Sequence, residues 1–174
     1  MPPKSKAQST EIDPKEFYLS EYASLREEML KRIELQHQII TLALVAVGTF
    51  ITIGTQPNSD ALILLIYPIF ASFLAVGWYQ HNLRIKRIGD YIREKIESKV
   101  LAGGWEQHRT NITAKIKVSA TVISASGTFA GTQLLTIVLA IPKLVFSEIE
   151  LWLLLADGLA IVLTILAVRR RPLM

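Results

Sequence analysis

Asp157 is the one charged side chain within an otherwise uncharged, mostly apolar run at residues 151–168. A helical run of this length can cross the hydrocarbon core of a bilayer. A carboxylate there costs at least about 2.5–3.5 kcal/mol unless it faces protein or water. Asp157 lies twelve residues before Arg169, or about 18 Å along a helix. Counting residues in the same way from the basic ends of two other apolar runs finds polar residues at a similar depth. Together with Asp157 they make a set of five: Asp157, Thr128, Thr132, Ser72 and Gln133.

We expect these five residues to form an intramembrane polar site, with the Asp157 side chain shielded from lipid and hydrogen-bonded to a neighbouring helix. Two roles remain open for the carboxyl group. It could serve ion conduction or coupling, or it could be a protonated, hydrogen-bonded packing residue.

Two histidines sit in polar clusters at the ends of two further apolar runs. Gln36 precedes His37, and Gln80 precedes His81. In an antiparallel hairpin these four residues share one level. The imidazoles could sense pH, but two of them without a third ligand make a poor metal site. The alternative is a belt of polar residues at the headgroup boundary, and we expect no bound metal or cofactor.

Small residues mark a third candidate site. Gly127 and Gly131 form a GxxxG pattern, and Ser124 lies three residues before the first glycine. Small side chains let helix backbones approach closely in lipid. This face could pack within the chain, form a subunit interface or line a pore.

The sequence contains no enzyme motif. A glycine-rich phosphate loop, HExxH, GxSxG and an acidic cluster with metal-binding spacing are all missing from it. The lack of cysteine excludes disulfides, thiolate metal sites and cysteine lipidation. We therefore do not expect an enzyme.

Composition and charge place the chain in a membrane. Its 174 residues are 51% hydrophobic, with a mean hydropathy of +0.35, too apolar for an ordinary soluble domain. Backbone groups in lipid must be paired internally, so each long run should be a helix. We predict an all-α, four-helix integral membrane protein that is tetraspanning, with these spans: 35–55, 61–83, 118–141 and 151–168.

Two of the predicted helices extend beyond the membrane. Asp13-Pro14 with Glu16 predicts a helix start, after a disordered segment at 1–12. One helix from about 14 to 55 then carries an apolar stripe: Tyr22, Leu25, Met29 and Ile33. After the second span a matching stripe follows: Ile85, Ile88, Ile92 and Ile96.

The extensions leave the membrane side by side, so the two stripes are predicted to face each other in an antiparallel stalk. The alternative is that each lies on the lipid surface as an amphipathic helix. The chain thus divides into a long helical hairpin at 13–100, a connection at 101–117, a second hairpin at 118–168 and a basic tail at 169–174.

Basic residues predict the orientation. Of 19 Lys and Arg, six precede the first span, nine lie between the second and third spans, and three follow the fourth. Only Lys143 falls on the other side. By the positive-inside rule both termini and the stalk should be cytoplasmic, with the protein in the inner (plasma) membrane. The charge positions thus explain the net charge of +4 without a nucleic-acid partner.

The 13–100 hairpin, with its Tyr22-to-Ile33 and Ile85-to-Ile96 stripes, resembles the SLATT-type membrane proteins of bacterial conflict systems. The second pair of spans departs from the two-span form of that family. The resemblance implies a membrane effector switched by a cytoplasmic partner. We expect a homo-oligomeric channel or effector that binds such a partner through its stalk. The alternative is a membrane anchor, scaffold or accessory subunit of a larger complex.

Overall fold

The computed structural model describes residues 14–100, 104–106, 108 and 120–169. Every regular element in these residues is helical, which confirms the all-α class for this part of the chain. The elements are α1 (Pro14–Gly54), α2 (Ala61–Tyr91), the π-turn η1 (Ile92–Glu97), α3 (Ser98–Val100), α5 (Ala120–Ala140), the 3-10 turn η2 (Ile141–Lys143) and α6 (Glu148–Arg169). The predicted disordered segment 1–12, most of the connection 101–117 and most of the basic tail 169–174 lie outside the described residues.

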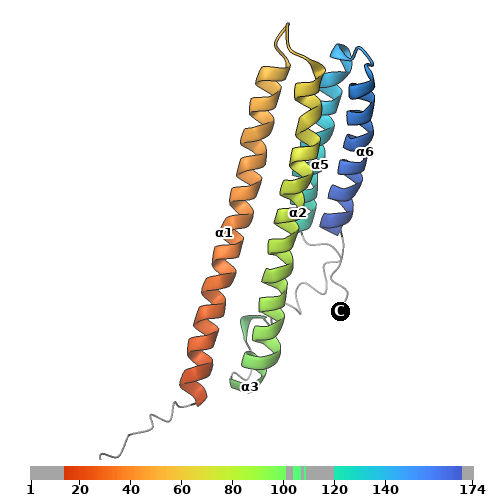
Figure 1. Cartoon of the computed structure of the whole chain (residues 1–174). Coiled ribbons are helices and arrows are strands. Elements are labelled where there is room, and N and C mark those ends of the chain that lie inside the picture. The colour runs from red at the N-terminus through yellow and green to blue at the C-terminus, as the bar shows by residue number, and fades with distance from the viewer. Residues whose placement is uncertain (1–13, 101–103, 107, 109–119, 170–174) are drawn as a thin grey trace, which may run out of the picture.

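Helix α2 is the centre of the bundle. It packs against α1, α5 and α6, and α5 also contacts α1 and α6. Figure 1 shows α1 and the lower part of α2 continuing well beyond the lower ends of α5 and α6. The bundle therefore has a four-helix part and a two-helix extension.

Four helices are long and apolar enough to cross a membrane: Lys15–Gly54, Ala61–Glu97, Val122–Lys143 and Glu148–Leu166. In the most apolar window of the second, 44% of residues are buried, against 17% in that of the first. The central helix α2 thus supplies much of the core, whereas α1 leaves large apolar side chains exposed, such as Leu42 and Val45.

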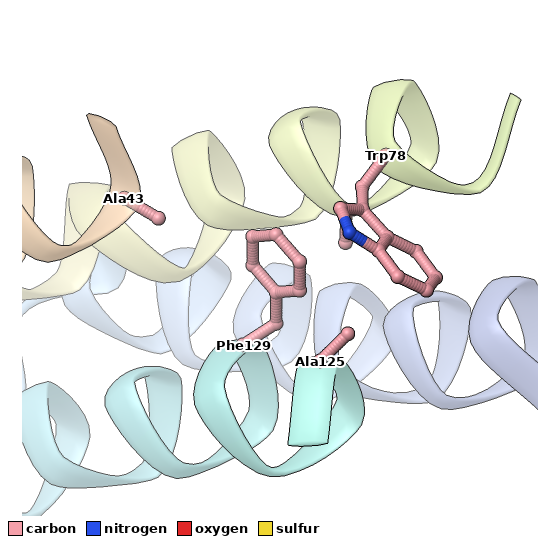
Figure 2. Close-up of a cluster of buried hydrophobic side chains, with 5 residues drawn as sticks. Ala43, Trp78, Ala125 and Phe129 are labelled. Carbon is pink, nitrogen blue, oxygen red and sulfur yellow. The ribbon is translucent and has the colours of Figure 1, made fainter. Parts of the chain in front are cut away.

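Aromatic and small side chains alternate in the core between α1, α2 and α5. Figure 2 shows Trp78 of α2 and Phe129 of α5 together with Ala43 and Ala125. All four are almost completely buried. The alanines leave room for the two large rings, so three helices close around one cluster.

The turn between α1 and α2 depends on a close approach at Gly54. A Cβ atom there would lie 2.5 Å from the Leu64 side chain, so glycine is needed for the helices to meet. Across the bundle, the Lys143 ammonium group donates to the Gln56 carbonyl oxygen and to the Ser59 hydroxyl oxygen at 2.8 Å. Lys143 thus joins the turns of the two hairpins and satisfies a carbonyl just past the end of α1.

The second hairpin turn is held by Glu150. Its carboxylate accepts the backbone N–H groups of Val145 at 3.1 Å and Ser147 at 2.9 Å. Between them Phe146 adopts a φ of 58°, which is uncommon for a non-glycine residue. The Ser147 hydroxyl in turn accepts the Glu150 N–H at 3.4 Å, completing a capping box. These bonds start α6 at Glu148, three residues before the predicted span.

Candidate functional site

Asp157 is completely buried in the four-helix part of the structure, with 0% of its surface exposed. Neither carboxylate oxygen has a hydrogen-bond partner within the described residues. The prediction that the surrounding protein shields the side chain agrees with this position. The prediction that Thr128, Thr132, Ser72 or Gln133 bonds to it is wrong in this structure.

The predicted partners make other bonds. Gln133 Nε2 donates to the Pro68 carbonyl at 3.1 Å and to the Thr164 hydroxyl at 3.0 Å. The Ser72 hydroxyl donates to the Ile69 carbonyl one turn back in its own helix.

The two predicted threonines on α5 are likewise bonded elsewhere. Thr132 accepts a bond from the Tyr67 hydroxyl at 2.9 Å, and the Thr128 hydroxyl donates to the Ser124 carbonyl. Counting residues from the end of a run gives depth only. It does not give direction around the helix axis, which is why the two threonines share a level with Asp157 but do not bond to it.

A set of buried polar residues that keeps three of the five predicted ones lies on the three helices that pack together. We call it the polar core: Ser72 of α2, Gln133 and Thr136 of α5, and Asp157 and Thr164 of α6. The prediction missed Thr136 and Thr164. A signal for Thr164 was present, since it follows Asp157 by seven residues and so lies on the same face of α6. Gln133 Oε1 also lacks a partner among the described residues, so the polar core contains three unpaired acceptor oxygens.

The GxxxG face points away from the bundle. Gly127, Gly131 and Ser124 are exposed, and a Cβ atom at either glycine would have no neighbour within 4 Å. The two glycines therefore make no close helix contact within the described part of the chain. Of the three roles that the sequence left open, packing within the chain is the one that this geometry disfavours.

The two histidine clusters do not form a shared site. Gln36 is buried and donates to the Trp78 carbonyl at 3.3 Å, whereas His37 and Gln80 are exposed. His81 is half-buried, and its Nδ1 has no partner among the described residues. The described residues contain no group of three metal-binding side chains.

The two apolar stripes pack against each other in the two-helix extension. Met29, Ile92 and Ile96 are buried at its centre. The stripe residues packed against them are Tyr22, Leu25, Ile33, Ile85 and Ile88. The structure therefore brings all eight predicted residues into one seam.

A polar contact beside the seam also joins the two helices. The Tyr91 hydroxyl donates to Glu21 at 2.8 Å. This hydrogen bond raises the pKa of Tyr91, because ionisation would remove the proton that the hydroxyl donates, and the negative charge of Glu21 acts in the same direction.

Two carboxylates at the end of the extension were not predicted as site residues. Glu97 and Glu106 are almost completely buried, with 0% and 2% of their surfaces exposed. The Arg26 guanidinium lies 3.0 Å from the Glu106 carboxylate, across 80 positions of sequence. No local pattern signals a contact between residues so far apart.

Comparisons with protein-family models, with curated proteins and with solved structures find no match for this chain. Function must therefore be argued from its own residues.

Proposed function

We propose that the chain is a tetraspanning protein of the inner membrane whose copies associate through α5 to form a channel or membrane effector. Its termini and two-helix extension lie on the cytoplasmic side, where the extension is a stalk that receives a protein partner. The observation that carries the proposal is the bare face of α5 at Gly127 and Gly131. The proposed function involves no catalysis, cofactor or nucleic acid.

The bare face suits contact between helices better than contact with lipid. At Gly127 and Gly131 the backbone is uncovered, and Ser124 and Thr128 add polar side chains beside it. Lipid chains offer these groups no hydrogen bonds. A second copy of α5 could approach closely along the glycines, and the hydroxyls could bond across the interface.

The polar core supports a path for ions. Asp157 is buried with both oxygens unpaired among the described residues, an arrangement that lowers stability. Ionisable residues in membrane spans commonly belong to ion pathways or proton relays. Helix α5 has the bare face on its exposed side and Gln133 on the side that faces the bundle interior. A shift of α5 at the subunit interface would therefore also change the polar core.

The stalk supports control from the cytoplasm. Its helices extend past α5 and α6 (Figure 1) and are fixed to each other by the eight-residue seam. The excess of basic residues on this side favours its placement in the cytoplasm. A partner that binds the stalk can act on the spans because α1 and α2 each run without a break from stalk to span.

The direct test is electrical recording from the purified protein in planar bilayers, together with native mass spectrometry of the protein in lipid nanodiscs. We expect discrete conductance steps and a species larger than one chain. Asp157→Asn should change the conductance without changing the assembly. A strictly monomeric parent protein that conducts no ions would reject the proposal.

A second function is favoured by the stalk alone. A long, internally packed extension is also what an anchor or accessory subunit needs to hold a cytoplasmic complex at the membrane. In that case the protein conducts no ions, and Met29→Asp releases a co-purifying partner while leaving the four spans inserted. The conductance measurement separates the two functions.

A further inference from the structure

A π-turn, Ile92–Glu97, replaces regular helix at the end of α2. In a regular α-helix two residues five apart point about 140° away from each other. The hydrogen bonds of a π-turn instead join residues five apart and bring them towards one face. Ile92 and Glu97 are five apart and both are completely buried. The π-turn therefore turns the Glu97 carboxylate inwards beside the apolar seam.

The buried carboxylate holds the chain that leads back towards the membrane. Glu97 Oε1 accepts the backbone N–H of Glu106 at 3.1 Å. A Cβ atom at Gly104 would lie 2.0 Å from Glu97 Cδ, so only glycine leaves room for the carboxylate here. The His108 N–H donates to the Gly104 carbonyl at 3.1 Å and closes a short turn. Residues 104–106 and 108 are thus fixed on the end of α2.

Arg26 of α1 fixes the same segment from the other side. Its Nη1 donates to Glu106 Oε1 at 3.0 Å, and its Nε donates to the Tyr22 hydroxyl at 3.1 Å. The guanidinium carbon lies 5.2 Å from the centre of the Tyr22 ring, within cation–π range. Tyr22 packs on the seam. The contact at Glu106 is therefore continuous with the packing of α1 on α2.

We propose that these residues form a clasp, consisting of Arg26, Glu97, Gly104 and Glu106, through which the stalk limits the position of α5. Eleven residues, 109–119, lie between His108 and Ala120, where α5 begins. They can span roughly 40 Å at most, so the place where the clasp holds His108 limits where α5 can start. The Arg26 side chain is 24% exposed, so a partner on the stalk can reach it and release Glu106.

The test combines two measurements on the full chain in nanodiscs. Amide hydrogen exchange at Glu106 and His108, whose N–H groups are bonded in the clasp, reports whether the clasp is closed. Spin labels on Thr49→Cys of α1 and Ser124→Cys of α5 report the position of α5. The chain has no cysteine of its own, and dilution with unlabelled chain removes distances between copies. The clasp variants are Arg26→Ala and Gly104→Ala.

The controls match each clasp variant. Arg32→Ala removes an arginine that pairs with Glu28, four residues away on the same helix, and not with the returning chain. Gly48→Ala adds a methyl group at a glycine with nothing within 4 Å. We expect at least tenfold faster exchange at the Glu106 and His108 amides in both clasp variants. We also expect a shift or broadening of the label distance by several ångströms, with neither change in the controls.

Two results would overturn the clasp. Exchange that stays at the parent rate in both clasp variants would show that Arg26 and Gly104 do not hold this segment on the stalk. Faster exchange with an unchanged label distance would show that the clasp acts locally and does not limit the position of α5. The consequence of the clasp for ion flux rests on the proposed function. A parent protein without flux would reject the channel but would leave the label distance to decide the clasp.

Discussion

The side-chain nitrogen of Gln133 lies 3.0 Å from the hydroxyl oxygen of Thr164, joining α5 to α6 inside the bundle. The same nitrogen donates to the Pro68 carbonyl of α2 at 3.1 Å. One carboxamide group therefore ties three helices together in the buried interior. Pairs of this kind fix which faces of neighbouring helices meet.

A double-mutant cycle should measure this bond. Gln133→Leu and Thr164→Val each remove one partner, and we expect a coupling of about 0.6–1.7 kcal/mol in unfolding experiments in detergent or bicelles. Thr52→Val is the control, because the Thr52 hydroxyl is exposed and donates only to the Gly48 carbonyl of its own helix. A coupling near zero would show that Gln133 and Thr164 act independently.

The seam between α1 and α2 should be sensitive to charge on one side of α1 only. Met29 is buried with 7% of its surface exposed, whereas its neighbour Leu30 is 66% exposed. Met29→Asp places an unpaired charge among apolar side chains and should lower the free energy of unfolding by about 3 kcal/mol or more. Leu30→Asp should change it by less than about 0.5 kcal/mol. Equal melting temperatures for the two variants in detergent would contradict the observed packing.

The sequence predicted the elements better than the contacts between them. Pro14 and Glu16 mark the start of α1 because proline and acidic residues suit the first helical turn. The stripe residues Met29 and Ile96 could be assigned to the buried face because helical spacing fixes which residues share a face. Such patterns are local, and they are read directly from the residue order.

What the sequence could not predict depends on the rotation and pairing of helices. Thr128 and Asp157 lie at similar depth, yet Thr128 bonds within α5 while Asp157 faces the interior. The inward turn of Glu97 needs a π-turn, for which its neighbours give no local signal. The Arg26–Glu106 contact depends on how the chain returns after Gly104. Each of these follows from tertiary packing.

Assembly should depend on the bare face of α5. Gly127→Leu fills the space that a second copy would need, so we expect the oligomer to weaken at least tenfold in cross-linking or native mass spectrometry. Gly48→Leu is the matched control, because Gly48 on α1 also has nothing within 4 Å. Neither change should disturb the single chain. If both variants assemble like the parent, the interface lies elsewhere.

The topology can be tested with single cysteines on the cysteine-free chain. We expect a membrane-impermeant maleimide, added from outside, to label Asn58→Cys and Ser147→Cys, which lie in the two hairpin turns. Ser98→Cys at the end of the stalk should be labelled only after the cells are opened. The physical reason is the distribution of basic residues, 18 of 19 of which would then be cytoplasmic. Labelling of Ser98→Cys from outside would show that the true orientation is the reverse of the predicted one.

Replacing Asp157 by an apolar residue should raise the stability of the protein and abolish its ion flux. Its carboxyl group is completely buried, and neither oxygen is paired within the described residues. An apolar side chain of similar size avoids the cost of an unpaired polar group, so Asp157→Leu should raise the free energy of unfolding by about 1–3 kcal/mol. If the carboxyl group serves the proposed channel, the same variant should abolish ion flux in liposomes. Asp157→Asn keeps the shape and a polar group, and should assemble normally with reduced flux.

A loss of stability in Asp157→Leu would mean that the carboxyl group has a stabilising partner in the native membrane. Greater stability with unchanged flux in both variants would show that the proposed channel does not use Asp157.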